Sequence, residues 1–303
     1  MDGILPVNKP EGVSSAAVVA RVKKTLKVKK AGHTGTLDPF ATGLLLIAIG
    51  KATRISRFFL GGSKQYLAQV TLGVETDTLD CTGNVTKEAG KEALSPISPK
   101  DVAETVAGFS GVQEQVAPSF SALKHNGKPL YQLARQGTYI EKPPRSIEIF
   151  DIRVTGMDLP RFDIVVHCSG GTYIRSLARD IGQQLTCGAH LSGLTRTRSG
   201  RFSLEQALDL DALEKMDPAS IADGIVPMAD CLDFMPTALA GKEMAGKIAH
   251  GQKLAIADLD FETGAVQNAS DPVRILDENK RLLAVVEPDK SGRFYNYCCV
   301  FPV

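Results

Sequence analysis

The run from Gly32 to Gly43 contains the residues of this chain best suited to chemistry. It holds three glycines, three threonines, one proline, one histidine and a single carboxylate, Asp38. Gly and Pro disfavour regular structure, and threonine hydroxyls bond back to nearby backbone, so the run predicts a tightly turned loop. The apolar residues Leu44–Ile49 predict a buried strand directly after it. Such a loop could position Asp38 as a reactive carboxylate, although an aspartate before a proline also commonly caps a turn.

Six short motifs accompany this run in a fixed order along the chain. They are Val7-Asn8-Lys9-Pro10, Lys64-Gln65-Tyr66, Thr76-Asp77-Thr78-Leu79-Asp80, Ser121-Ala122-Leu123-Lys124, Gly171-Thr172-Tyr173-Ile174-Arg175 and Cys187-Gly188-Ala189-His190-Leu191. Together with Gly35–Gly43, these motifs resemble the TruB family of tRNA pseudouridine synthases. The resemblance extends over roughly two-thirds of the chain. It is strongest to the bacterial enzymes that make pseudouridine-55 in the T-loop of tRNA.

The resemblance implies three catalytic residues, Asp38, Tyr66 and Arg175. Asp38 would be the nucleophile, and Tyr66 would stack on the uracil and take part in proton removal. Arg175 falls in the first turn of a helix predicted from Thr172, where the helix dipole disfavours a cation. A buried carboxylate partner would offset this cost, and the resemblance supplies Asp38. Pairing with a cation is then expected to lower the pKa of Asp38.

Further residues are implied to contact the substrate, namely His33, Tyr66, Tyr173, Leu194, Lys9 and Lys124. His33 would fill the place that the target base leaves in the RNA loop, and Tyr173 and Leu194 would complete the wall of the pocket. By residue type alone, a tyrosine near the start of a half-buried strand more often packs in a core. An isolated histidine likewise more often belongs to a turn, so these roles depend on the resemblance.

Two positions depart from the family pattern. Phe120 stands where the family usually has a tyrosine, which removes any hydrogen bond from that phenol. Thr195 replaces the first arginine of the usual Leu-Arg-Arg-Thr-Arg, which removes one expected phosphate contact. Arg196, Arg198 and Arg201 remain.

Charge is distributed unevenly along the chain, although the net charge is only +1. Residues 1–60 carry ten Lys/Arg against three Asp/Glu, residues 61–202 carry sixteen against fourteen, and residues 203–303 carry nine against seventeen. A polyanion is therefore expected to meet the N-terminal part and to avoid most of the acidic C-terminal part. The basic residues between 21 and 30 lead directly into the Asp38 loop, which favours phosphate contact over a merely solvated helix face.

The remaining composition indicates the cellular setting. The six cysteines form no C-x-x-C pair, which favours reduced thiols over disulfides or a zinc site. No apolar run has transmembrane length and no signal-peptide pattern is visible, so we expect a cytoplasmic protein without a membrane partner. No cluster has metal-ligand spacing, and the implied reaction needs neither metal nor organic cofactor. The expected partner is tRNA, bound through its T-stem-loop by a monomer.

The predicted elements fit neither a regular β-α-β alternation nor an all-β chain. A helix capped by Ser14 or Ser15 should run to about Leu26. Further helices are predicted at residues 51–60 and 204–216, and a strand is predicted to begin at Val116. We therefore predict an α+β fold with a mixed, largely antiparallel central sheet flanked by helices, as the resemblance implies.

Two domains are expected. Residues 1–229 would form the catalytic domain, with an RNA-clamping insertion within about 84–145 that Lys124 would suit. Residues 230–303 contain strand-like runs around 273–276, 282–286 and 295–300 and would form a small β domain of the PUA type.

Two other functions compete with this interpretation. A guide-RNA-dependent relative would share the catalytic motif but work inside a multiprotein particle. The insertion and the lack of long basic tails speak against it. A tRNA-folding chaperone could have lost catalysis, yet Asp38, Tyr66 and Arg175 are all present. A chaperone role alongside catalysis stays open.

Overall fold

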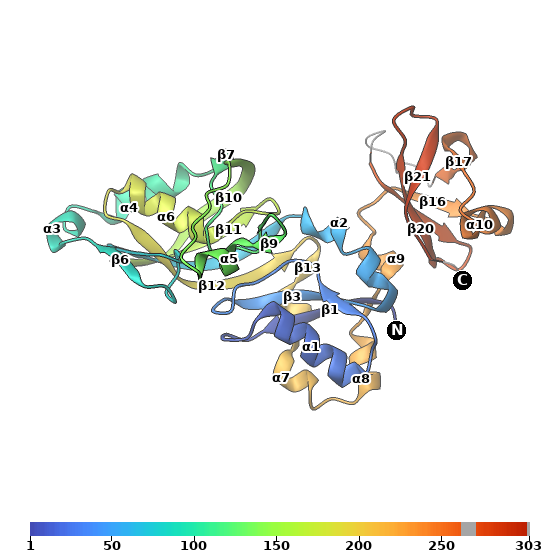
Figure 1. The fold of residues 1–303 in the computed structure, drawn as a ribbon, viewed down its shortest axis with the longest axis horizontal. Helices are drawn as coiled ribbons and strands as arrows, with labels where there is room; N and C mark the ends of the chain where they lie inside the picture. Colours follow the sequence, from blue (N-terminus) through green and yellow to red (C-terminus); the bar gives the residue numbers. More distant parts are fainter. Residues whose placement is uncertain (262–270, 302–303) are drawn as a thin grey trace.

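The computed structural model describes residues 1–261 and 271–301 and shows a mixed α/β body with a small β domain at one end (Figure 1). The described residues of the body form an eleven-stranded sheet with the main order β14-β1-β3-β12-β4-β11-β10-β7. Its strands are β1 (Gly3–Lys9), β2 (Ala31–His33), β3 (Thr42–Ile49), β4 (Lys64–Leu72), β7 (Gly111–Gln115), β10 (Arg145–Asp158), β11 (Arg161–Cys168), β12 (Ala189–Ser199), β13 (Phe202–Ser203), β14 (Leu208–Asp209) and β15 (Val226–Pro227). The pairs β1–β14 and β3–β12 are parallel, whereas β1–β3, β4–β12, β4–β11 and β10–β11 are antiparallel. The predicted fold class is confirmed.

Helices pack on both faces of this sheet. Those of the body are α1 (Ser15–Leu26), α2 (Arg57–Leu60), α3 (Lys91–Leu94), α4 (Pro99–Ala107), α5 (Leu130–Ala134), α6 (Ile174–Gln184), α7 (Leu210–Leu213), α8 (Pro218–Asp223) and α9 (Met228–Cys231). Helix α1 buries Val18, Val22 and Leu26 in the main core, where α4, α6 and the long strands also meet. The Ser14 hydroxyl accepts a hydrogen bond from the Ala17 amide, so Ser14 is the predicted cap.

The small domain packs at one end of the body, against the face of β1 and β3 opposite α1 (Figure 1). It contains α10 (Lys242–Ala249) and a six-stranded sheet of β16 (Thr237–Ala240), β17 (Leu254–Ala255), β18 (Asp260–Phe261), β19 (Val273–Asp277), β20 (Leu282–Pro288) and β21 (Phe294–Val300). Ile4, Leu44 and Leu46 of the body share one apolar cluster with Val285 and Phe301 of this domain. The boundary at residue 230 stays a prediction, and residues 262–270 and 302–303 of that predicted domain lie outside the described residues.

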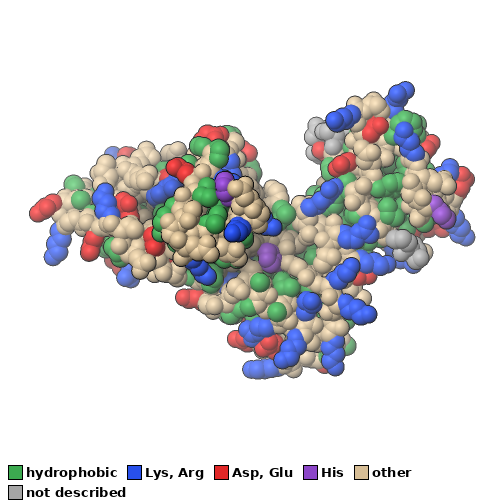
Figure 2. Space-filling view, in the orientation of Figure 1, with side chains coloured by type: hydrophobic (Ala, Val, Ile, Leu, Met, Phe, Trp, Pro, Cys, Tyr) green, Lys and Arg blue, Asp and Glu red, His purple; other side chains and the backbone are tan. Residues whose placement is uncertain are grey.

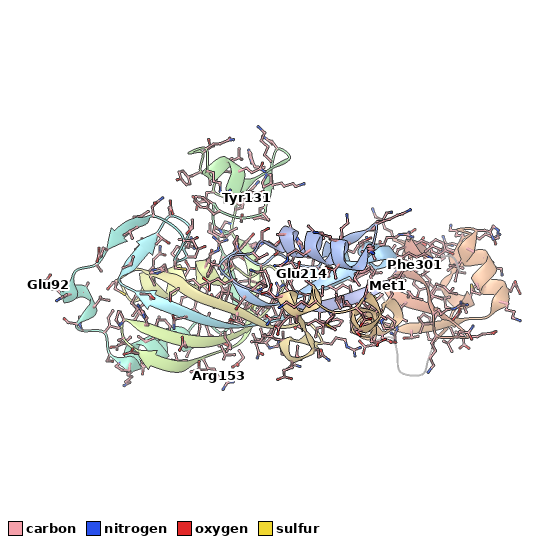
Figure 3. All side chains as sticks on the ribbon, turned by 90° about the horizontal axis from the view of Figure 1, so that it is seen from below. Met1, Glu92, Tyr131, Arg153, Glu214 and Phe301 are labelled. Atoms are coloured by element: carbon pink, nitrogen blue, oxygen red, sulfur yellow. The ribbon has the colours of Figure 1, made fainter. Side chains whose placement is uncertain are left out.

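A lobe formed by residues 116–144 stands out from the body, with Tyr131 near its centre (Figure 3). It contains the hairpin of β8 (Lys124–His125) and β9 (Lys128–Pro129) and helix α5. Another hairpin, β5 (Val74–Thr76) with β6 (Val85–Glu88), lies toward the end of the body that is farthest from the small domain (Figure 1). Asn126 and Gly127 form the turn between β8 and β9, with positive φ at both residues.

The strand predicted from Val116 is wrong, because β7 ends at Gln115. Pro118 lacks the amide that a ladder would need. The carbonyl of Val116 instead accepts a hydrogen bond from the Ser176 hydroxyl, and that of Phe120 accepts one from Arg175. Backbone groups that a strand would pair with a neighbouring strand are therefore bonded to side chains of α6.

The two other helices predicted from sequence are broken. In residues 51–60, the hydroxyls of Thr53 and Ser56 bond back to carbonyls three residues earlier, and a 3₁₀ turn at Gly50–Arg54 precedes the short α2. In residues 204–216, β14 pairs in parallel with β1, leaving a 3₁₀ turn (Leu204–Gln206) before it and α7 after it. Competing sheet and side-chain bonds interrupt both helices.

Candidate active site

The loop between β2 and β3 carries Asp38 and is fastened to α1. The Leu37 amide donates to the Ser15 hydroxyl at 2.9 Å, and that hydroxyl also lies 2.9 Å from the Leu37 carbonyl. The Gly12 amide donates to the Pro39 carbonyl at 2.8 Å. These bonds fix the backbone on both sides of Asp38, so the carboxylate extends from a rigid loop.

Lys9 supports this loop from beneath. Its side chain is fully buried, and its Nζ donates to the carbonyls of Pro10, Val13 and Pro39 at 2.8, 2.7 and 3.0 Å. Burial lowers the pKa of Lys9 to about 8, against the opposing effect of the nearby Asp38 carboxylate. The amine thus joins β1 to the residue that follows Asp38.

Arg196 on β12 holds the other end of the loop. Its guanidinium is almost fully buried and donates to the carbonyls of Leu44, Thr36 and Gly35 at 2.7, 3.4 and 3.2 Å. The chain passes close to this residue at Gly43, where φ is +98° and an added Cβ would lie 2.4 Å from the Arg196 carbonyl oxygen. Only glycine fits at that position.

Arg175, at the start of α6, connects two carboxylates. Its Nε lies 2.9 Å from Asp38 Oδ2, its Nη2 donates to Asp38 Oδ1 at 3.2 Å, and its Nη1 lies 3.4 Å from Asp80 Oδ2. The carbonyls of Thr78 and Phe120 accept two more hydrogen bonds, each at 2.8 Å. A cation in the first turn of a helix is therefore stabilised by two carboxylates and two carbonyls, which outweigh the dipole.

The pKa of Asp38 is raised above its ordinary value, mainly because burial disfavours the charged form. The Arg175 guanidinium opposes this shift, whereas the neighbouring Asp80 carboxylate adds to it. The expectation of a lowered pKa is wrong, because it counted the cation and left out both burial and the second carboxylate.

A cavity of about 510 Å³ opens beside Asp38 and Arg175. Tyr66, Tyr173 and Leu194 line it. The remaining lining residues are Leu60, Lys64, Arg145, Arg196 and the other residues of the segments 35–38, 122–123 and 171–175. Burial raises the pKa of the Tyr66 phenol, so its hydroxyl stays protonated in neutral solution. The cavity has the size of a small-ligand site, with one carboxylate at its wall and aromatic rings around it.

Comparisons with known proteins agree with this geometry. Residues 23–174 match the N-terminal domain of the TruB family pseudouridylate synthases, and residues 175–233 match the tRNA pseudouridylate synthase B C-terminal domain. The protein named tRNA pseudouridine synthase B of Geobacter sulfurreducens is 42% identical over 91% of this chain and 90% of its own. That of Dehalococcoides mccartyi is 37% identical over 97% and 95%. The chain belongs to the TruB family.

Solved structures extend the likeness to the small domain. A Cbf5-Nop10-Gar1 complex contains a chain that is 27% identical and superposes with a TM-score of 0.73, over 94% of this chain and 78% of that one. An H/ACA RNP bound to a substrate RNA containing 2'-deoxyuridine gives 25% identity and a TM-score of 0.72, over 99% and 84%. The fold shared with these chains therefore extends through both sheets of this protein.

The structure brings together most of the residues expected from the TruB resemblance. Asp38, Tyr66, Arg175, Tyr173 and Leu194 all line one cavity. The three other expected contacts, His33, Lys124 and Lys9, do not line this cavity. Their roles toward a substrate stay predictions.

His33 ends β2 and is half-buried, outside the residues that line the cavity. Burial and the nearby Arg196 lower its pKa, which keeps the ring neutral. Lys124 is exposed on the lobe, whereas its neighbours Ala122 and Leu123 reach the cavity. Lys9 has no exposed surface, so the structure offers it contact with the loop rather than with a substrate.

Three residues with evident roles at the cavity received none from the sequence: Asp80, Lys64 and Arg145. Arg196 remained among the arginines expected to contact phosphate but is buried and bonded to backbone carbonyls. Asp80 pairs with Arg175, and Arg145 lines the cavity. Lys64 is buried and donates to the carbonyls of Phe59, Leu60 and Gly62 at 2.9, 3.4 and 2.5 Å, which fixes the turn after α2. Asp80 and Lys64 lie within the family motifs, and this position could have marked them as site residues. Neither an aspartate nor a lysine is expected to be buried, however, so their roles were not predicted.

The basic surface differs in part from the expected one. Arg21 pairs at 2.8 Å with Asp211 on α7 and at 2.7 Å with Glu214, which caps the end of α7. Arg201 pairs with Asp233. These arginines are occupied within the protein. By contrast, exposed lysines without an ion pair among the described residues follow α1, namely Lys27, Lys29 and Lys30. Figure 2 shows blue side chains gathered over the part of the body that carries α1.

The described residues give no metal site, since no three His, Cys, Asp or Glu side chains among residues 1–261 and 271–301 are grouped to bind an ion. Within the same residues, none of the helices has the length and apolar character that crossing a bilayer requires.

Proposed function

We propose that this TruB-family protein converts uridine 55 in the T-loop of tRNA to pseudouridine, with Asp38 as nucleophile and without a cofactor. The observation that carries the proposal is the Asp38 carboxylate, fixed by Arg175 at the wall of the 510 Å³ cavity. The relatives named tRNA pseudouridine synthase B, which align over most of this chain, support tRNA as the substrate.

The reaction requires the target uridine to leave the base stack. Flipping a base out of a folded loop costs roughly a few kcal/mol, which contacts in the cavity must return. The N1–C1′ bond then breaks and a C5–C1′ bond forms, while C5 loses a proton and N1 gains one. Asp38 would bond to the detached fragment, at the ribose or at the uracil ring, and leave when C5 attaches.

The other residues around the cavity would stabilise and position the reacting groups. Arg175 would favour the ionised form of Asp38 against the effect of burial. Tyr66 would stack on the flipped uracil. Burial keeps its phenol protonated, so it would not act as a base while the uracil enters, and any part in proton removal would come after the base is rejoined. Tyr173 and Leu194 would close the wall, and the neutral His33 would stack in the RNA loop.

The decisive experiment measures tritium release from a tRNA transcript labelled at C5 of uridine. Wild type should release label from uridine 55, and Asp38→Asn should release none while still binding the transcript. Asp163→Asn is the matched control, because Asp163 is an exposed carboxylate on β11 outside the cavity lining. Normal turnover by Asp38→Asn would refute the nucleophile, and release that persists when uridine 55 is replaced would refute the site.

The competing functions predict different results in the same assay. A guide-dependent enzyme would release label only after a guide RNA and partner proteins were added. A pure chaperone would bind the transcript in both forms and release nothing. Either result would overturn the proposal.

A further inference from the structure

Arg145 is the first residue of β10 and directly follows the lobe. It lines the same cavity as Asp38. Its guanidinium carbon lies 4.6 Å from the centroid of the Tyr173 ring, and its Nη2 donates to the Gly171 carbonyl. Arg145 is therefore held at the wall of the cavity by an aromatic face on one side and the backbone on the other.

Most hydrogen-bond donors of Arg145 have no acceptor among the described residues. Its Nε is buried without a hydrogen-bond partner, and only Nη2 donates to a protein atom. A buried donor without an acceptor is costly, so such a group calls for a ligand or another explanation.

The other cations of the cavity are already bonded within the protein. Arg175 binds Asp38 and Asp80, while Lys64 and Arg196 each donate to three backbone carbonyls. The Nε of Arg175 also lacks a hydrogen bond, but it lies 2.9 Å from Asp38 Oδ2 in an ion pair. Among the described cations that line the cavity, Arg145 is thus the one whose unbonded Nε has no ion-pair partner either. A negatively charged ligand could accept hydrogen bonds from the donors of Arg145 that have no partner in the protein.

We propose that Arg145 binds a phosphate group next to the target uridine and so fixes the flipped nucleotide against Asp38. The inference rests on the proposed function, since a nucleotide that enters the cavity brings its phosphates with it. A guanidinium offers two parallel donors that match two phosphate oxygens, and the Tyr173 ring restrains its plane. The alternative is a structural role, in which Arg145 only holds the Gly171–Tyr173 turn. Gln115 already fixes this turn, with its side-chain amide bonded to both the amide and the carbonyl of Tyr173.

The test is a cycle that combines a change in the protein with a change in the RNA. A T-stem-loop RNA is synthesised with one uncharged methylphosphonate linkage, on the 5′ or the 3′ side of the target uridine. Binding is measured in an Asp38→Asn background, so that no turnover intervenes. We expect one of the two linkages to weaken RNA binding by the Asp38→Asn protein that retains Arg145 roughly tenfold, because a charge-assisted hydrogen bond is lost. Arg145→Gln should weaken binding of unmodified RNA by a similar factor and abolish the effect of that linkage.

Arg153→Gln is the matched control, because Arg153 is an exposed arginine of the same strand and lies on the side of the body opposite Tyr131 (Figure 3). It should keep the full linkage effect. The proposal is overturned if neither linkage affects the arginine-containing protein, or if Arg145→Gln and the linkage weaken binding additively. If Arg145→Gln does not fold, Arg145→Lys replaces it and should retain only part of the linkage effect, because an ammonium keeps the charge but not the paired donors. Tritium release by the wild type on unmodified RNA separately tests the proposed function.

Discussion

The buried cations around the cavity and the exposed cations beside α1 carry the same charge but use it differently. Lys9, Lys64 and Arg196 are buried, and each donates to three backbone carbonyls. Lys29 and Lys30 are exposed and form no ion pair among the described residues. The buried cations fix backbone around the cavity, whereas the exposed lysines can exchange counterions for phosphates.

The buried cations therefore stiffen the backbone around the cavity, whereas the exposed lysines are expected to contribute to affinity for RNA. Burying an amine has a desolvation cost in free energy. Its hydrogen bonds to carbonyls fix the geometry of the loop, and a nucleophile must be held in such a fixed geometry. An exposed lysine contributes little to folding, because water already solvates it. Substitutions on the two sides should therefore change different observables.

The largest effect is expected at Arg175, the buried cation that contacts Asp38, the proposed nucleophile. Arg175→Gln leaves the Asp38 and Asp80 carboxylates without their shared cation, so the pKa of Asp38 should rise further and more of it should be protonated near neutrality. Single-turnover tritium release should fall at least roughly a hundredfold at neutral pH, as for the loss of a stabilising charge in an active site. Raising the pH should restore part of the rate, because it ionises Asp38.

Arg179→Gln is the control for this substitution. Arg179 belongs to the same helix, pairs with Asp180 and does not line the cavity. Its rate should stay close to wild type at every pH. A loss of rate in Arg175→Gln that no increase in pH reduces would contradict the ionisation argument.

The second prediction compares stability between a buried and an exposed lysine. Lys9→Met removes the donor to three carbonyls and should lower the free energy of unfolding by about 2 kcal/mol or more. Lys29→Met should change it by less than about 0.5 kcal/mol, as is usual for surface positions. Urea titration of both variants gives the two values, and equal losses would refute the division between the two groups of cations.

The sequence predicted the main residues that line the cavity better than it predicted the buried residues that hold the cavity walls in place. Asp38, Tyr66 and Arg175 stood in motifs that the TruB family shares, and the unfavourable position of Arg175 in a helix already required a carboxylate partner. The second carboxylate, Asp80, was not foreseen, since nothing in residue type shows that one arginine binds two aspartates. The burial of Lys64 and Arg196 was not foreseen either, because lysines and arginines are mostly exposed in proteins and nothing in their residue type marks the buried ones.

The fold shows a similar division. Helix α1 and strands β3 and β4 follow from periodicity and caps, which are local properties. The missing strand at Val116 and the broken helix at residues 204–216 depend on partners far along the chain, namely α6 and β1. Local patterns cannot show which distant group will take a backbone hydrogen bond.

The third prediction concerns the pH dependence of the wild type. Asp38 must be ionised to act as nucleophile, and burial raises its pKa, so the rate should fall with decreasing pH around a midpoint above the ordinary aspartate value of about 3.9. Asp80→Asn removes a neighbouring negative charge that raises this pKa and should move the midpoint to lower pH. Single-turnover rates at saturating enzyme measure both profiles. A midpoint that rises in Asp80→Asn would contradict the assigned interaction between the two carboxylates.

The smallest effect is expected for one exposed lysine beside α1. If Lys29 contacts an RNA phosphate, Lys29→Gln should reduce the slope of log affinity against log salt concentration by roughly 0.7–0.9, the value for one phosphate contact. Filter binding of a tRNA transcript over a range of salt concentrations measures this slope. Lys247→Gln is the control, because Lys247 lies on the acidic small domain and pairs with Glu243 at 2.9 Å. An unchanged slope for Lys29→Gln, or an equal change for Lys247→Gln, would mean that the exposed lysines beside α1 do not distinguish the body from the small domain in RNA binding.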